Sequence, residues 1–124
     1  MTPYTNHQTL NDIRWWTGMP LTLKVGGQII QVRARGTVAL TVTAADKLGA
    51  QIPNPDDLSS TLTPHLNLAA IDAVGELSHS AANLAQLTTL TSASRDIFKA
   101  NMASKLAEFG VQVDHVTIEA IESV

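Results

Sequence analysis

Leu21–Thr43 reads LTLKVGGQIIQVRARGTVALTVT, and this stretch decides the fold. From Val32 to Val42, apolar or small residues occupy every second position, and arginines and threonines fill most positions between them. Such alternation is the period of a β-strand that has one buried face and one wet face. A strand of this kind is stable only when another part of the chain covers its apolar face. The stretch therefore predicts a sheet that is covered by helices from the rest of the sequence.

Glycines in this stretch indicate where the strand begins and where it bends. Gly26 and Gly27 separate two alternating runs, and paired glycines supply the positive φ angles of a tight hairpin turn. We therefore predict an antiparallel hairpin of Leu21–Val25 with Gln28–Thr43. Gly36 has no side chain to pack, so we expect a bend, a bulge or the close approach of another backbone there.

Both tryptophans of the chain precede this hairpin, as Trp15 and Trp16 within Asp12–Gly18. Adjacent residues of a strand point to opposite faces, so we expect one indole in the core and the other half exposed. The half-exposed one either anchors a lipid interface or a subunit contact, or covers the edge of its own sheet. Residues 1–11 show no clear period, and both an edge strand and an ordered arm fit them.

Two main helices are predicted after the hairpin. The first takes Asp56 or Asp57 as its N-cap and runs to about Ser78, with apolar residues three and four positions apart. Pro64 interrupts this pattern, because proline cannot donate the backbone hydrogen bond of a helix interior. We expect either a kink at Pro64 or a helix that starts near Thr63.

The remaining elements follow from turn chemistry. Residues 44–49 predict a short helix that stops at its glycine, and residues 79–96 predict a connector with a short helical turn. The second main helix should begin near Ser92 or Ser94 and end at Phe109, with Gly110 as a left-handed cap. A last strand is predicted at residues 111–121, with a bulge at Asp114-His115 where the alternation changes phase. The predicted fold is therefore one α+β domain over residues 1–124: an antiparallel sheet with a long hairpin, two main helices packed on one face, and a C-terminal strand.

The overall composition excludes several classes of protein. The 124 residues are 44% hydrophobic and carry a formal net charge of −3, which argues against a nucleic-acid partner. The chain has no cysteine, which excludes a disulfide framework and a thiolate metal site. No apolar run approaches the roughly 20 residues of a membrane-spanning helix, and no basic-then-apolar signal segment is visible. We expect a cytoplasmic chain without a transmembrane segment.

Acid–base chemistry finds little support in the sequence. His65, Asp72, Glu76 and His79 share one face of the first main helix, and Glu76–His79 has the Glu-x-x-His spacing of carboxylate-bridged metal sites. Such sites need a second copy of the motif, which the chain lacks, so a solvated helix face is the simpler interpretation. Ser78 lies beside His79, but no Gly-x-Ser-x-Gly elbow surrounds it. We predict no metal, no cofactor and no enzymatic activity.

Arg33 and Arg35 occupy the polar face of the long strand. Two interpretations remain open for this pair. The arginines meet acids of a neighbouring subunit, or they are exposed to solvent and pair across the sheet with Thr or Glu.

Several short motifs in the chain resemble those of one known domain family. They are Asp12–Trp15 with Gly18–Pro20, Val32–Thr37, Asp57-Leu58 with Ala73–Leu77, and Phe109–Val113 with Ile118–Ile121. In this order the motifs are similar to those of the SPFH or band 7 domain (stomatin, prohibitin, flotillin, HflK/C), and most similar to its bacterial virion-core-protein-like branch. The resemblance covers about residues 12–121. The chain departs from the family pattern at Trp16 and Pro64, in a missing or very short opening strand, and in lacking the family's coiled-coil or zinc-ribbon tail, so we expect a fragment or a minimal version of a longer architecture.

The resemblance implies a non-enzymatic scaffold that self-associates and organises partner proteins, peripherally at the inner face of a cell membrane. The residues assigned to such contacts are Trp15, Trp16, Arg33 and Arg35. The alternative is a small peptide- or partner-binding module that uses an exposed sheet edge.

Overall fold

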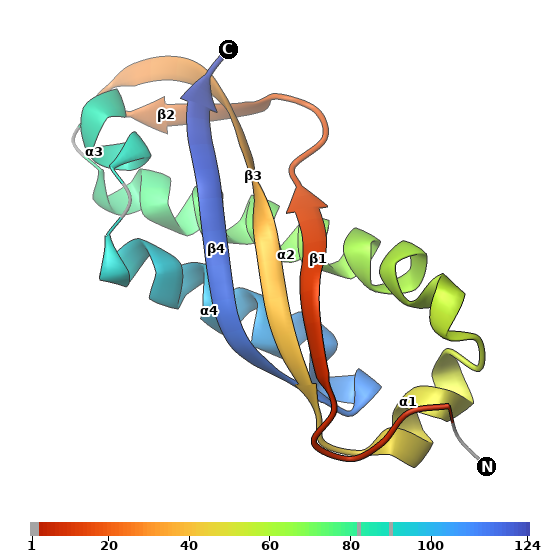
Figure 1. The fold of residues 1–124 in the computed structure, drawn as a ribbon. Helices are drawn as coiled ribbons and strands as arrows, with labels where there is room; N and C mark the ends of the chain where they lie inside the picture. Colours follow the sequence, from red (N-terminus) through yellow and green to blue (C-terminus); the bar gives the residue numbers. More distant parts are fainter. Residues whose placement is uncertain (1–2, 82, 90) are drawn as a thin grey trace.

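The chain folds into an antiparallel sheet of four strands with its helices on one face (Figure 1). The computed structural model describes residues 3–81, 83–89 and 91–124. The strands are β1 (Thr9–Trp16), β2 (Leu21–Val25), β3 (Gln28–Val42) and β4 (Val111–Ser123). The helices are α1 (Ala45–Gln51), α2 (Leu58–Ser80), α3 (Leu84–Thr88) and α4 (Ser92–Leu106), with 3₁₀ turns at Pro55–Asp57 and Ala107–Phe109. The predicted α+β fold class is confirmed.

β3 is the centre of the sheet. β1 lies antiparallel along one edge of β3 and β4 along the other, while β2 pairs with the beginning of β3 (Figure 1). Val25 pairs with Gln28 across a two-residue turn in which Gly26 and Gly27 have φ angles of 57° and 82°. The predicted hairpin and the reason for its two glycines are therefore confirmed.

Two departures from regular pairing, both between β3 and β4, occur where the sequence predicted them. A Cβ atom on Gly36 would lie 1.9 Å from the backbone oxygen of Thr117 and 2.7 Å from the Trp15 ring, so the predicted close approach is confirmed. Beside Gly36 the β3–β4 register shifts, which leaves Glu119 as an extra residue in β4. A second shift leaves Asp114 as an extra residue, which confirms the predicted bulge.

One face of the sheet forms the core with α2 and α4. Trp15 is only 1% exposed, and the centroid of its ring lies 5.1 Å from the ring centroid of Phe98 on α4. Its indole N–H donates to the backbone oxygen of Thr37 at 3.0 Å, so its polar atom is satisfied inside the core. The opposite face of the sheet carries the alternating polar residues and is covered by no helix of the described chain (Figure 1).

The start of α2 agrees with the predicted N-cap at Asp56 or Asp57. The helix begins at Leu58 and runs through Pro64 without ending, so a helix start near Thr63 is wrong. Asp57 is the N-cap residue but its side chain makes no capping hydrogen bond. Asn54 instead accepts from the backbone N–H of Asp56 at 3.1 Å, because a 3₁₀ turn precedes the helix and takes the cap.

The other helix ends show how well turn chemistry predicts boundaries. α1 continues through its glycine to Gln51, so the predicted stop is wrong; the helix ends where Ile52 is buried and a proline follows. α4 begins at Ser92 as predicted, with the Thr91 side chain accepting from Ser94 N at 3.1 Å. The chain then tightens into a 3₁₀ turn before Gly110, whose φ of 73° confirms the left-handed cap. Residues 3–8 form an arm with buried Tyr4, and β1 follows it, so the N-terminal stretch combines both predicted alternatives.

Candidate functional site

Trp16 is the most prominent feature of the open face of the sheet. It is the last residue of β1 and is 48% exposed. Its side chain forms part of the wall of two neighbouring hollows, a groove of about 620 Å³ between β1 and α2 and a smaller hollow of about 190 Å³ over β3. One aromatic side chain thus borders both depressions, which makes it the natural centre of a contact surface.

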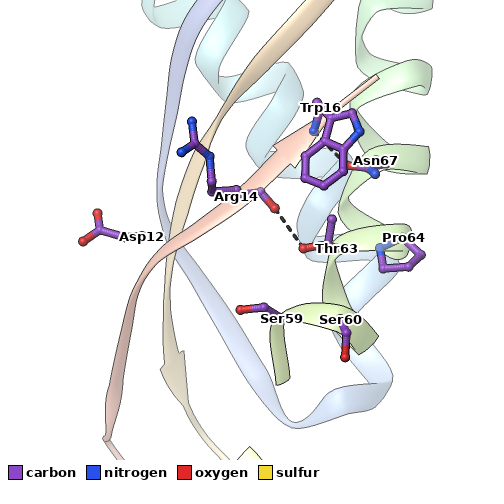
Figure 2. Close-up of a pocket in the computed structure, with 8 residues that line it drawn as sticks. All are labelled: Asp12, Arg14, Trp16, Ser59, Ser60, Thr63, Pro64 and Asn67. Carbon is purple, nitrogen blue, oxygen red and sulfur yellow. Dashed lines mark hydrogen bonds between the residues drawn. The ribbon is translucent and has the colours of Figure 1, made fainter. Parts of the chain in front are cut away.

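The larger groove follows the outer edge of β1, and two side chains of α2 hold this edge (Figure 2). The Thr63 hydroxyl donates to the backbone oxygen of Arg14 at 2.9 Å, and Asn67 Oδ1 accepts from the backbone N–H of Trp16 at 2.8 Å. In Figure 2 the side chains of Asp12 and Arg14 point away from α2, whereas the Trp16 ring lies next to Asn67. Backbone groups that an edge strand usually offers to another strand are therefore occupied at these positions.

Pro64 and the first turns of α2 complete the wall of the groove. Ser59, Ser60 and Pro64 line it opposite β1. Because proline has no N–H, it cannot donate to the Ser60 carbonyl one turn earlier, and that oxygen keeps its acceptor capacity. The residue that interrupts the helix pattern thus adds an apolar ring and frees an acceptor beside the groove.

The smaller hollow lies between Trp16 and two arginines of β3. Its lining includes Arg33, Arg35 and Glu122. The loop that follows β1 is fixed here, because Thr17 N donates to Ala34 O at 3.0 Å and the Thr17 hydroxyl accepts from Ala34 N at 3.2 Å. The two hydrogen bonds of Thr17 to Ala34 therefore help to fix the position of Trp16 relative to β3.

Ion pairs on the open face leave one arginine without an acid. Arg35 Nε lies 3.5 Å from Glu119, and its Nη1 lies 3.2 Å from Glu122. Arg33 is the register partner of Glu122, yet among the described residues no carboxylate lies within 4.0 Å of its guanidinium. Arg14 reaches Glu119 only at 4.0 Å. Arg35 thus pairs across the sheet with Glu, one of the two open interpretations, whereas Arg33 keeps a free positive charge beside Trp16.

Three of the four predicted interaction residues come together at this site. Trp16, Arg33 and Arg35 all line the smaller hollow. Trp15 does not join them, because its side chain is buried between the sheet and α4 and has almost no surface to offer. The sequence did not single out Thr63 and Asn67. A signal for them exists, since they are polar residues four positions apart on a helix whose neighbouring positions are apolar.

The two acids of α2 both contact α4. Asp72 lies 3.4 Å from Lys105 Nζ of α4, and the Asn101 side chain of α4 donates to Glu76 at 3.1 Å. His65 packs its ring edge against Phe109 with 5.0 Å between centroids. In the part of the chain that the structure describes, no group of three or more His, Cys, Asp or Glu side chains is placed to hold a metal ion.

The N-terminal arm contributes one perturbed titratable group. Burial raises the pKa of the Tyr4 hydroxyl above its usual value of 10.0, and the Asp57 carboxylate adds to this rise. The hydroxyl therefore stays neutral at pH 7, and the carboxylate of Asp57 lies close enough to influence it.

No family model matches the chain, and the search of curated proteins also gives no match. Within residues 3–81, 83–89 and 91–124, none of the helices combines the length and apolar character needed to cross a membrane.

Proposed function

We propose that the chain is a non-enzymatic assembly domain that binds copies of itself and partner proteins through the open face of its sheet. The observation that carries this proposal is Trp16, half exposed between two hollows with the unpaired Arg33 beside it. Tryptophan and arginine are the residues most enriched among those that dominate binding energy in protein interfaces. Trp16 lies on β1 and Arg33 on β3, two paired strands of one sheet, so little backbone entropy is lost when a partner docks.

The motif resemblance to SPFH domains supports the same function. It implies a scaffold that works by geometry and makes or breaks no bond. In this proposal the domain lies at the cytoplasmic face of a membrane, and other segments or partners provide the membrane attachment.

Strand addition at a sheet edge is the alternative, and two observations favour the face over the edges. The outer edge of β1 is held by Thr63 and Asn67 of α2. β4 lies at the other edge of the sheet (Figure 1), and the extra residues Asp114 and Glu119 interrupt it. Bulges of this kind break the regular row of backbone groups that an added strand needs.

The solution mass tests this function. Light scattering after size exclusion should give a mass that rises above 13.2 kDa as the protein concentration increases. Trp16→Ala and Arg35→Glu should each reduce this rise, whereas Leu68→Ala, which removes another exposed apolar side chain from α2, should leave it unchanged. A wild-type mass that stays at 13.2 kDa at every concentration would contradict self-association.

A further inference from the structure

Pro53–Asp57, here called the acid turn, forms an exposed surface that carries two neighbouring acids. All five of its residues are exposed, and no Lys or Arg of the described chain lies within 4.0 Å of the carboxylates of Asp56 and Asp57. Two prolines restrict its φ angles, and the Asn54 side chain caps the 3₁₀ turn that contains the acids. The acid turn is therefore an ordered, proline-rich and negatively charged projection.

The charges of the molecule are divided unevenly between its two layers. The helical part, residues 43–110, has four Lys or Arg against seven Asp or Glu, which accounts for the whole net charge of −3. The rest of the chain, which forms the sheet, has four residues of each sign. A sheet face with a free Arg33 and an acidic helical layer are complementary surfaces of the same chain, and opposite charges steer such surfaces together.

We infer that the hollow beside Trp16 of one copy receives the acid turn of a second copy, with its prolines against the indole and its carboxylates toward Arg33. This inference rests on the proposed self-association and specifies the contact that produces it. Aromatic-lined grooves are the usual docking sites of proline-rich segments, because the preformed backbone loses little entropy on binding. Arginine and carboxylate form charge-assisted hydrogen bonds that fix the orientation of the contact.

The two surfaces lie in different places on one copy, which determines the kind of assembly. The acid turn connects α1 and α2 and lies toward the beginning of β1, whereas Trp16 ends that strand (Figure 1). A contact between two different surfaces joins copies head to tail, and it gives a ring if the rotation closes and a filament if it does not. Each copy then uses one hollow and one acid turn.

A pair of complementary variants tests this arrangement. Arg33→Glu reverses the charge of the receiving hollow and leaves the acid turn intact. The double variant Asp56→Lys and Asp57→Lys reverses the charge of the acid turn and leaves the hollow intact. Each alone should remain at 13.2 kDa by light scattering at concentrations where the wild type associates. An equimolar mixture should regain association, because the intact hollow of one variant meets the intact acid turn of the other, and the two altered surfaces carry opposite charges as well.

Matched variants control for charge alone. Lys24→Glu makes the same change of charge as Arg33→Glu, but on β2 and outside both hollows. Asp46→Lys with Asp96→Lys makes the same change of charge as the lysine variant, but at two exposed acids outside the acid turn. Both controls should associate like the wild type. A mixture that stays monomeric, or controls that lose association equally, would overturn the head-to-tail contact while the wild-type mass still rises. A wild-type mass that never rises would instead remove the proposed self-association itself.

Discussion

Trp15 and Trp16 are neighbours in the chain, and the two faces of the sheet give them opposite environments. Trp15 is 1% exposed and packs against Phe98, whereas Trp16 is 48% exposed and borders two hollows. The covered face contains the aromatic and aliphatic contacts of the core, and the open face contains arginines and glutamates in loose ion pairs. The covered face therefore supplies the stability of the fold, and the open face can be altered with little effect on folding.

The largest expected difference in stability between the two faces comes from replacing each tryptophan in turn. Trp15→Ala should lower the free energy of unfolding by about 3–5 kcal/mol, because it leaves a cavity beside Phe98. Trp16→Ala should lower this free energy by less than about 1 kcal/mol, because the Trp16 side chain is half exposed to solvent. Urea unfolding followed by circular dichroism measures both values. Equal losses for the two variants would show that the faces do not differ as proposed.

Gly36 provides the next test of the covered face. Gly36→Ala would place its Cβ 1.9 Å from the backbone oxygen of Thr117, and backbone cannot move aside as a flexible side chain can. We expect a loss of about 2–3 kcal/mol in urea unfolding, at the upper end of the cost of overpacking. Gly75→Ala is the matched control, because its Cβ meets nothing within 4 Å on α2. It should raise the stability by about 0.5–1 kcal/mol through helix propensity, and a loss there would weaken the steric explanation.

Local patterns in the sequence predicted most of the sheet. Strict alternation in β3 and the paired glycines were sufficient for the hairpin, and the phase change in β4 was sufficient for one of its bulges. The sequence could not decide between an edge strand and an arm for residues 9–11, because the β1–β3 register shifts between Leu10 and Ile13 and Asp12 has a φ of 58°. A bulge of this kind moves the alternation out of phase in the middle of a short strand.

The candidate site was predicted only in part, because contacts between distant residues create it. The alternation placed Arg33 and Arg35 on the open face, but it could not choose which tryptophan would join them. The groove exists because α2 crosses the edge of β1, where Asn67 bonds to a backbone group 51 residues earlier in the chain. The free charge of Arg33 arises because Glu122 turns toward Arg35 instead of its own register partner. The second event has no local signal in the sequence, and the first has only the polar pair Thr63 and Asn67 among apolar neighbours.

The hydrogen bond that joins α2 to the edge of β1 gives a third test. Thr63→Val removes the hydroxyl that donates to the Arg14 carbonyl and keeps the shape of the side chain. Urea unfolding should show a loss of about 1 kcal/mol, the usual contribution of one such hydrogen bond. Thr61→Val, on the same helix outside the groove, controls for helix propensity. A loss no larger than that of the control would mean that water replaces the hydroxyl at the edge of β1.

The smallest effect on stability and a distinct effect on association should come from Glu122→Gln. Its ion pair with Arg35 is exposed and Glu119 remains, so the unfolding free energy should change by less than about 1 kcal/mol. The same change removes a negative charge from the hollow beside Trp16, and the acid turn of a second copy would then approach with less repulsion. Association should therefore strengthen, as a rise in mass at lower protein concentration, and added salt should diminish the gain because it screens exposed charges. Glu108→Gln, an exposed acid of the helical layer, should produce no such gain. Weaker association of the Glu122 variant would mean that the glutamate itself contacts the partner, and the open face would then recognise a base instead of an acid.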